Sequence, residues 1–267
     1  MDLSKRSYQK ELLDRDDIPF GEIEKNMQEL NFINTWLGGH AITVSGLKRL
    51  LEDGKHRNRS PVDTCGPYQS SGDTGAAGNQ QIPLTVSICE IGAGGGDNLA
   101  ALSRYCRSKG IRVRLTGIDI NPHCIAVARK RFAGQDAHFL LSDYRMVSFG
   151  SEKPDIIFSS LFCHHFTDEE LVGMLDWMKA NSGMGFFIND LQRNIIAYHA
   201  IRLLTSWFSR SRLVKNDAPL SVLRGFTRSE WKEILHHAEM RNYSLRWKWA
   251  FRWLLVVRVG GISYIED

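Results

Sequence analysis

Apolar and polar positions alternate along residues 84–259 in a rhythm typical of mixed α/β proteins. Seven apolar runs of strand length predict strands over 84–91, 113–120, 138–141, 155–159, 185–189, 244–249 and 253–259. Apolar residues recur every three to four positions over 99–106 and 123–131, which predicts helices between the first strands. Strands that alternate with short helices are typical of βαβ units. We therefore expect an α/β fold, a Rossmann-like, seven-stranded, mostly parallel sheet with helices on both faces, in which the last two strands form a closing hairpin.

The chain outside this rhythm divides into three further segments. Helical periodicity over 21–37 and 42–51 assigns residues 1–53 to an N-terminal helical cap or lid. Residues 54–82, rich in Gly, Ser, Asn, Gln and Asp, predict a flexible linker before the core at 83–267. A helical insertion is expected at about 194–226. Within it, residues 215–219 predict a polar turn that offers Asp217 as a candidate pocket acid.

Composition excludes several classes of protein. With 267 residues, 43% hydrophobic and 24% charged, the chain has the composition of a globular protein rather than a disordered or fibrous one. Its start is charged and lacks a secretory signal, and its apolar runs fall short of the roughly 18 residues of a membrane helix, so we expect a cytoplasmic protein that does not bind membranes. Five cysteines contain no CxxC pair, which argues against a zinc ribbon or a thioredoxin-like redox site.

Basic residues are concentrated in one part of the chain. The net charge is +4, but residues 193–258 carry 13 Lys or Arg against 4 Asp or Glu. This excess permits an anionic substrate or RNA. The basic residues are scattered and no RNA-binding signature accompanies them, so a small-molecule acceptor is favoured over nucleic acid.

The strongest chemical signal is a glycine-rich turn between the first expected strand and its helix. Gly92, Gly94 and Gly96 supply backbone freedom and bare main chain for a ligand. The dinucleotide fingerprint fails because Asp97 stands where its third glycine belongs, and no Lys-Ser/Thr ending supports a P-loop. Glu90 precedes the turn. An acidic residue followed by alternating glycines suits a positively charged ligand without phosphates.

This pattern resembles motif I of the class I S-adenosylmethionine-dependent methyltransferases. Three more positions support the resemblance in the expected order, each at a strand end. Asp119 follows Gly96 by 23 residues, where a carboxylate can accept both ribose hydroxyls. Asp143 stands where the family accepts the adenine amino hydrogens, and the strand at 155–159 leads past the reactive methyl group. The resemblance implies S-adenosylmethionine as cofactor, with Glu90 near its amino-acid end.

The cofactor-binding residues that the resemblance implies surround these four strand ends. They are Glu90, Gly92, Ala93, Gly94, Gly96, Asn98, Asp119, Ile120, Ser142, Asp143, Tyr144 and Leu161.

Two adjacent histidines follow the fourth strand, where the family places residues of the acceptor side. His164 and His165 are the candidate catalytic residues, because a base is needed when the acceptor is a hydroxyl. We expect them to point in different directions, so that one faces the pocket. The alternative is that one or both cap the helix beginning at Thr167. We expect no metal site, since His164 and Asp168 share helical spacing without an obvious third ligand.

Substrate contacts are expected from two further regions. Asp190 and Arg193 follow the fifth strand and either contact substrate or pair with each other on the surface. Trp36 and His40, in WLGGH, either belong to an aromatic lid near the cofactor or pack in the core. WLGGH and the segment RLVKNDAPLSVLRGFTRSE resemble bacterial small-molecule methyltransferases encoded beside type III polyketide synthases.

Together these features predict a methyltransferase of small aromatic or polyketide-like molecules in secondary metabolism, with O-methylation favoured. The alternatives are C-methylation of a phenol or quinol, RNA methylation, and a non-catalytic module that keeps the cofactor fold. The oligomeric state stays open.

Overall fold

The computed structural model describes residues 3–15, 18–57 and 85–259, and every structural statement below concerns these residues. Most of the expected linker, at 58–82, lies outside them. The seven expected strands are confirmed with boundaries that shift by no more than two residues. They are β1 (Thr85–Ile91), β2 (Arg112–Asp119), β3 (Ala137–Leu141), β4 (Ile156–Ser160), β5 (Gly185–Leu191), β6 (Tyr243–Lys248) and β7 (Arg252–Arg258).

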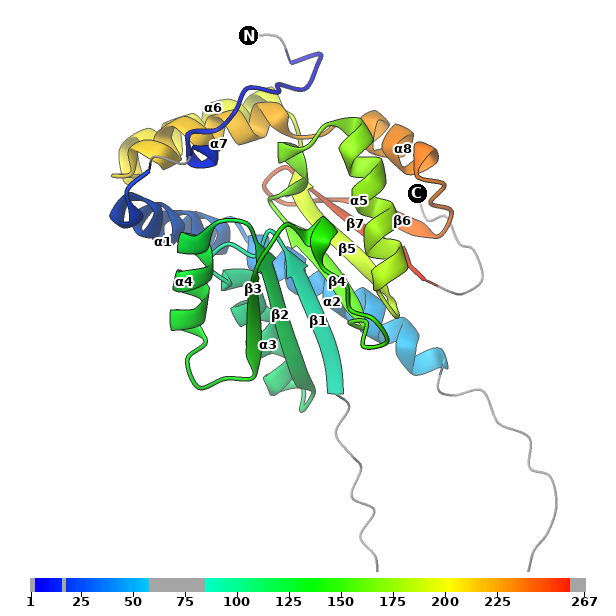
Figure 1. The fold of residues 1–267 in the computed structure, drawn as a ribbon. Coiled ribbons are helices and arrows are strands. Elements are labelled where there is room, and N and C mark those ends of the chain that lie inside the picture. Colours follow the sequence, from blue (N-terminus) through cyan, green and yellow to red (C-terminus); the bar gives the residue numbers. More distant parts are fainter. Residues whose placement is uncertain (1–2, 16–17, 58–84, 260–267) are drawn as a thin grey trace, which may run out of the picture.

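These strands form one sheet in the order β3-β2-β1-β4-β5-β7-β6 (Figure 1). Strands β1 to β5 pair in parallel, whereas β7 runs antiparallel to both β5 and β6. The expected Rossmann-like sheet with a closing hairpin is thus confirmed. The strand order reverses between β1 and β4, and ligands of such sheets bind at that point, beyond the carboxyl ends of the strands.

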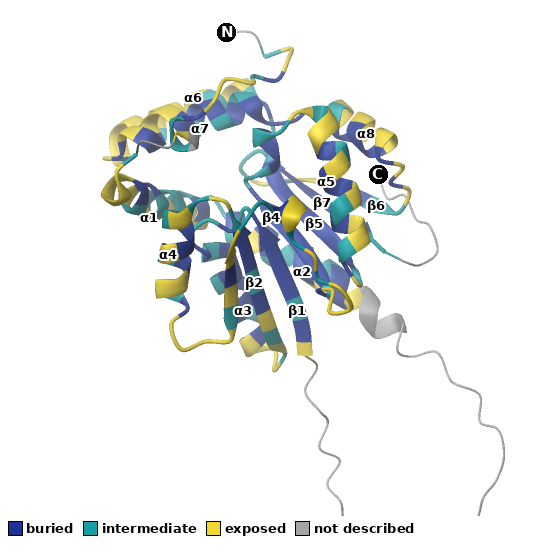
Figure 2. Ribbon diagram, viewed as in Figure 1, coloured by how far each residue is buried: buried dark blue, intermediate teal, exposed yellow. Residues whose placement is uncertain are grey.

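Helices cover both faces of the sheet, and the strands between them are largely buried (Figure 2). One face packs apolar side chains of α5 (Asp168–Asn181) and α8 (Arg228–His237), among them Leu175 and Trp231. The other face packs α2 (Gly39–Arg57), α3 (Asp97–Ser108) and α4 (Pro122–Arg131). Two hydrophobic clusters result, one on each side of the sheet.

The N-terminal helices differ in their role. Leu47 and Leu50 of α2 are buried against the sheet together with Phe187 of β5. Helix α2 is therefore a layer of the sheet fold, although the sequence pattern placed it in a cap. Helix α1 (Phe20–Trp36) lies outside this layer and packs against α2, α4 and α7 (Arg212–Arg224).

The chain from 194 to 226 forms two helices, α6 (Ile195–Phe208) and α7. The polar turn expected at 215–219 is wrong, because these residues lie inside α7. Ser211 caps the helix by accepting a hydrogen bond from the Val214 amide, and Val214 and Leu220 bury its apolar side. Pro219 costs the helix one backbone hydrogen bond, which this burial outweighs.

The first residues of the chain lie along α7. The Ser7 amide donates to the Leu223 carbonyl, and the Asp217 carboxylate accepts from the amides of Leu12 and Leu13 in the short 3-10 helix η1 (Leu12–Asp14). Asp217 thus anchors the N-terminal segment, a structural role. Through these bonds a segment remote in sequence reaches the carboxyl end of the sheet.

Within the described residues, no helix combines the length and the apolar content needed to cross a membrane.

Candidate active site

The glycine-rich turn connects β1 to α3 and demands glycine at three positions. Gly92, Gly94 and Gly96 have φ values of 67°, 51° and 72°, in the left-handed region that side chains with a Cβ disfavour. A Cβ at Gly92 would also lie 2.3 Å from the Phe162 ring. The turn therefore needs glycine both for its backbone conformation and for close packing beneath the site.

Asp119, at the end of β2, connects this turn to the neighbouring strand end. Its Oδ2 accepts a hydrogen bond of 2.8 Å from the Gly94 amide, and its Oδ1 accepts one of 2.8 Å from the Asn121 amide. Burial raises the pKa of this carboxyl, while the amide hydrogen bonds oppose the shift. Each oxygen keeps a further lone pair, so the side chain can still accept two hydroxyl groups.

A cavity of about 100 Å³ lies beside Asp119. Ile120 exposes 72% of its surface there, a large apolar area for a solvent-facing position. The lining residues are Gly92, Ile118, Asp119, Ile120, Ser142, Asp143, Tyr144, Arg145, Phe162 and Phe166. Six of the twelve predicted cofactor residues thus share one cavity whose walls combine carboxylates with apolar surface.

Asp143 caps the short helix η2 (Tyr144–Met146) and forms an ion pair with exposed Arg145, at 2.6 Å between Nη2 and Oδ2. These hydrogen bonds lower the pKa of Asp143. A carboxylate has about four lone-pair positions, so Asp143 can accept a further donor from a base in the cavity.

A row of buried polar side chains crosses the sheet beside the turn. Glu90, Ser160, Asn189 and Arg252 belong to the neighbouring strands β1, β4, β5 and β7. In its strand, each of these residues lies two positions from a member of the hydrophobic cluster that α2, α3 and α4 cover. Because side chains two positions apart point to the same face of a sheet, all four point to the face covered by these helices. Asn34 of α1 lies close by, because a Cβ on Gly39 would contact both Asn34 and Arg252.

Several atoms of this row lack hydrogen-bond partners among the described residues. They are Oε2 of Glu90, Oδ1 of Asn34 and of Asn189, and Nε and Nη1 of Arg252. Burial raises the pKa of Glu90 well above its usual range, and the neighbouring Asp97 carboxylate adds to the shift. Burial likewise lowers the pKa of Arg252 to about 10. Unsatisfied buried acids, amides and a guanidinium fit a ligand that carries both an ammonium and a carboxylate group.

The other predicted cofactor residues surround the turn without lining the cavity. The Ala93 amide donates to the Ile118 carbonyl. Asn98 donates a hydrogen bond of 3.1 Å to Oε1 of Glu90 and so orients that carboxyl. Leu161 has a φ of 53°, and its amide donates to the Asn189 carbonyl.

Trp36 and His40, the two candidate residues of WLGGH, lie in different surroundings. The Nε2 atom of His40 lies 2.7 Å from Oδ2 of Asp97, so His40 connects α2 to the start of α3. Trp36 exposes 76% of its surface at the end of α1 and stacks on Phe32. His40 therefore lies near the glycine-rich turn, whereas Trp36 faces solvent.

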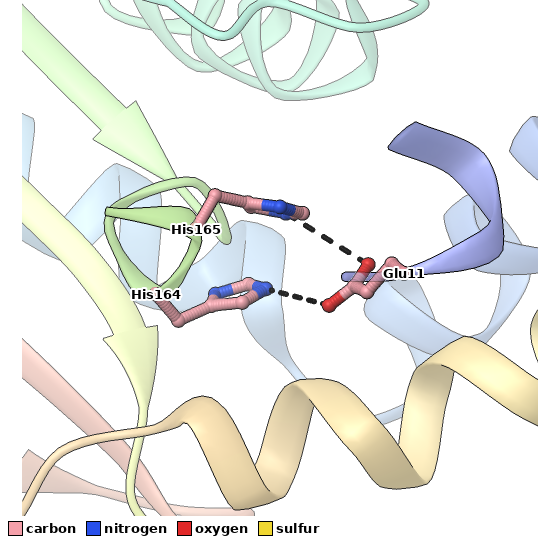
Figure 3. A group of neighbouring side chains, drawn as sticks. All are labelled: Glu11, His164 and His165. Carbon is pink, nitrogen blue, oxygen red and sulfur yellow. Dashed lines mark ion pairs between the residues drawn. The ribbon is translucent and has the colours of Figure 1, made fainter. Parts of the chain in front are cut away.

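The histidine pair lies in the short helix η3 (Cys163–His165), directly after β4. The expectation that the rings point in different directions is wrong. Their centroids are 4.4 Å apart and both rings face Glu11 of the N-terminal segment (Figure 3). Nor do they cap the next helix: Thr167 caps α5 together with Glu170.

His164 is buried between two carboxylates. Its Nδ1 lies 2.7 Å from Oδ1 of Asp190, and its Nε2 lies 3.5 Å from Oε1 of Glu11. Burial alone would lower the pKa of His164, but Asp190 and Glu11 outweigh it and raise the pKa to about 9. His165 is more accessible, with 22% of its side chain exposed, and its ring centroid lies 6.4 Å from that of Phe162 in the cavity wall.

Asp190 and Arg193 neither reach an open surface nor pair with each other. Asp190 is fully buried beneath His164 and accepts backbone hydrogen bonds from Phe162 and His164. Arg193 donates twice to Glu230, at 2.6 and 3.0 Å, and to the carbonyls of Leu3 and Gly225. We therefore correct both assignments: Asp190 positions the histidine, and Arg193 ties the N-terminal segment to α8.

Four residues of the site escaped the sequence pattern. Phe162 and Phe166 flank the histidines and could have been suspected from that position. Glu11 and Arg252 stand in segments without any motif, and only the fold brings them to the strand ends.

Comparisons with known proteins agree with this geometry. Residues 88–181 match the family described as methyltransferase domain, which is less than half of the chain. No curated protein matches the sequence.

Solved structures show the same fold at low identity. One is the plantazolicin methyltransferase BpumL with a triazolic desmethylPZN analog and SAH, at 19% identity and a TM-score of 0.53, covering 66% of this chain and 77% of that one. Another is a possible exported protein from Bordetella parapertussis, at 16% identity and a TM-score of 0.51, covering 67% and 63%. The chain shares the fold of the SAH-bound methyltransferase BpumL. The matched domain and the fold together support an S-adenosylmethionine-dependent methyltransferase.

Proposed function

We propose that this protein transfers a methyl group from S-adenosylmethionine to an oxygen of a small aromatic or polyketide-like acceptor. The observation that carries the proposal is the side-by-side placement of two sites. A cavity bordered by carboxylates and a row of unsatisfied polar atoms form the cofactor side, and the histidine pair with Glu11 forms the acceptor side. S-adenosylmethionine, when bound, supplies the methyl group on a sulfonium that is already a good leaving group.

On the cofactor side, the chain's residues recognise a nucleoside and an amino-acid end. Asp119 accepts the ribose hydroxyls, and Asp143 accepts the adenine amino group against the apolar surface of Ile120. Glu90 binds the ammonium, and Arg252 binds the carboxylate. The contacts of Glu90 and Arg252 satisfy buried polar atoms that otherwise have no partner among the described residues.

On the acceptor side, His165 is the residue placed to handle a proton. Its ring is partly exposed and lies beside Phe162, so a planar acceptor can approach it. The Nε2 atom takes the hydroxyl proton, and Glu11, 3.8 Å away, stabilises the resulting imidazolium. His164 and Asp190 hold the pair in position from beneath.

An aromatic acceptor is supported by Phe162 and Phe166, which lie next to the histidines. The resemblance to methyltransferases encoded beside type III polyketide synthases points to the same acceptor class in secondary metabolism. C-methylation of a phenol would use the same arrangement, and the products of the assay below distinguish the two reactions.

The first test measures binding of S-adenosylhomocysteine by calorimetry. Wild-type protein binds it, and Asp119→Ala weakens binding by about 1.5–3 kcal/mol through loss of charge-assisted hydrogen bonds. The matched control is Asp136→Ala, an exposed carboxylate far from the turn, which leaves affinity unchanged. Equal affinity for Asp119→Ala and wild type would remove Asp119 from the ribose site.

The second test identifies the acceptor with labelled S-adenosylmethionine and panels of phenols, quinols and RNA. We expect label in phenolic products and a turnover lowered about a hundredfold or more by His165→Ala, with little change in cofactor affinity. Incorporation into RNA alone, with affinity that falls steeply with salt, would favour the RNA alternative.

A further inference from the structure

Glu11, His164 and His165 bring three metal-ligating side chains together at the acceptor side. Figure 3 shows both imidazole rings facing the carboxylate of Glu11. The candidate ligand atoms all lie within 4.8 Å of one another. The sequence pattern gave no such site, because Glu11 is separated from the histidines by more than 150 residues.

The distances are those of ligands around a common ion. Two ligands of a tetrahedral ion, each about 2.1 Å from the metal, lie about 3.4 Å apart. Nε2 of His164 lies 3.5 Å from Oε1 of Glu11, and Nε2 of His165 lies 3.8 Å from Oε2. The same separations also fit direct ion pairs between the imidazoles and the carboxylate, and the uptake experiment below distinguishes the two.

The surroundings of His164 resemble those of a metal-bound imidazole. Such a histidine usually donates its second ring N–H to a carboxylate, which fixes the ring and leaves the other nitrogen free to coordinate. Asp190 provides that carboxylate, 2.7 Å from Nδ1. Asp190 itself is fixed by the backbone amides of Phe162 and Leu191.

Glu11 is likewise held in place. Ser221 of α7 donates a hydrogen bond of 2.6 Å to Oε1, and the residues after Glu11 are anchored by Asp217. Oε2 faces His165, the more exposed of the two histidines. A metal here would thus have three protein ligands and, on the side of the partly exposed His165, room for a further ligand, as in catalytic rather than structural sites.

We propose that Glu11, His164 and His165 bind one divalent transition-metal ion, of the type of Zn²⁺, whose open position takes an oxygen of the acceptor. The inference deepens the proposed function and rests on it. Two imidazoles and one carboxylate favour Zn²⁺, Co²⁺ or Fe²⁺ over Mg²⁺ and Ca²⁺, which prefer oxygen ligands alone. With the ion bound, Nε2 of His165 is a ligand and does not act as the base, so the hydroxyl proton, made more acidic by the metal, would pass to solvent.

The test measures metal uptake directly. Full-length protein is stripped with a chelator, incubated with Zn²⁺ or Mg²⁺, desalted and analysed by mass spectrometry for metal content. We expect about one Zn²⁺ per chain and no Mg²⁺. The Co²⁺-loaded protein should show visible bands without the near-ultraviolet band of thiolate ligands, which excludes binding by cysteine.

Variants locate the ion. Glu11→Gln and His165→Ala should each weaken Zn²⁺ affinity at least about tenfold. His138→Ala, which removes an exposed histidine outside the cluster, should not change it. Circular dichroism establishes that each variant is folded. As an independent measure of binding, Zn²⁺ should raise the Tm of the wild-type protein.

Two outcomes would overturn the metal site: no stoichiometric uptake by wild type, or unchanged uptake by both Glu11→Gln and His165→Ala. S-adenosylhomocysteine binding is measured on the same samples. Protein that binds S-adenosylhomocysteine but no metal retains the proposed function and loses this inference. Protein that binds neither loses both.

Discussion

On the cofactor side, Glu90 and Arg252 are buried with polar atoms that have no partner among the described residues. On the acceptor side, buried charges pair with one another, as Asp190 and Glu11 do with His164. The difference has a physical meaning. Unsatisfied buried groups cost folding free energy that a ligand can recover, whereas paired groups already contribute to the fold. Substitutions on the cofactor side should therefore change binding, and those on the acceptor side should change stability.

The largest expected effect lies on the acceptor side. In the metal-free protein, Asp190→Ala leaves the imidazolium of His164 buried with only Glu11 as partner, and should lower the free energy of unfolding by about 3–5 kcal/mol. Urea denaturation measures this loss. The exposed control Asp136→Ala should stay within about 0.5 kcal/mol of wild type. An equally small loss for Asp190→Ala would show that the buried pair does not stabilise the fold.

Comparing Gly92, in the glycine-rich turn, with Gly110, outside it, separates the cost of backbone strain from the cost of overpacking. Gly92 and Gly110 both have a φ of 67°, but a Cβ meets the Phe162 ring only at Gly92 and meets nothing within 4 Å at Gly110. Gly110→Ala should cost about 1–2 kcal/mol of stability for the backbone alone. Gly92→Ala should cost about 1–3 kcal/mol more through overpacking and should weaken S-adenosylhomocysteine binding. Equal losses in denaturation experiments would mean that Phe162 moves aside freely.

Arg252 provides the sharpest test of the comparison. Arg252→Met replaces a buried guanidinium by an apolar chain of similar length, so the unliganded protein should become more stable or stay unchanged. Binding of S-adenosylhomocysteine should weaken by about 1.5–3 kcal/mol, because the ligand's carboxylate loses its cationic partner. Thermal denaturation and calorimetry give the two readings. A variant that loses stability and keeps its affinity would place Arg252 in the fold rather than in the site.

The smallest effect concerns pH. The pKa of Glu90 is raised well above its usual range in the free protein. A bound ammonium favours the carboxylate and lowers that pKa, so binding releases up to one proton. Affinity for S-adenosylhomocysteine should rise with pH up to the free-protein pKa of Glu90 and level off above it.

Calorimetry in buffers of different ionisation enthalpy counts the protons released. Glu90→Gln should remove both the release and the pH dependence. If the variant releases as many protons as wild type, another group titrates.

The two sides also differ in how far the sequence revealed them. The cofactor side is built from strand ends that follow one another along the chain, so the spacing of the motifs predicted which residues meet there. Gly92, Asp119 and Asp143 line one cavity, as expected. The acceptor side combines Glu11, the histidines and Ser221, which have no local relation. Spacing cannot reveal such a group, because it depends on where the N-terminal segment lies on α7.

The sequence by itself determined the strands, most of the helices and the glycine-rich turn, because periodicity and backbone freedom are local properties. It did not determine that residues 215–219 continue a helix, since burial of the neighbouring apolar residues outweighs a proline and a polar run. Only the tertiary structure decided which partners the charged side chains take. The sequence predicted that Asp190 and Arg193 contact substrate or pair with each other on the surface, yet each is buried against a partner from another segment. Pairing of buried charges depends on three-dimensional proximity, which a local pattern does not contain.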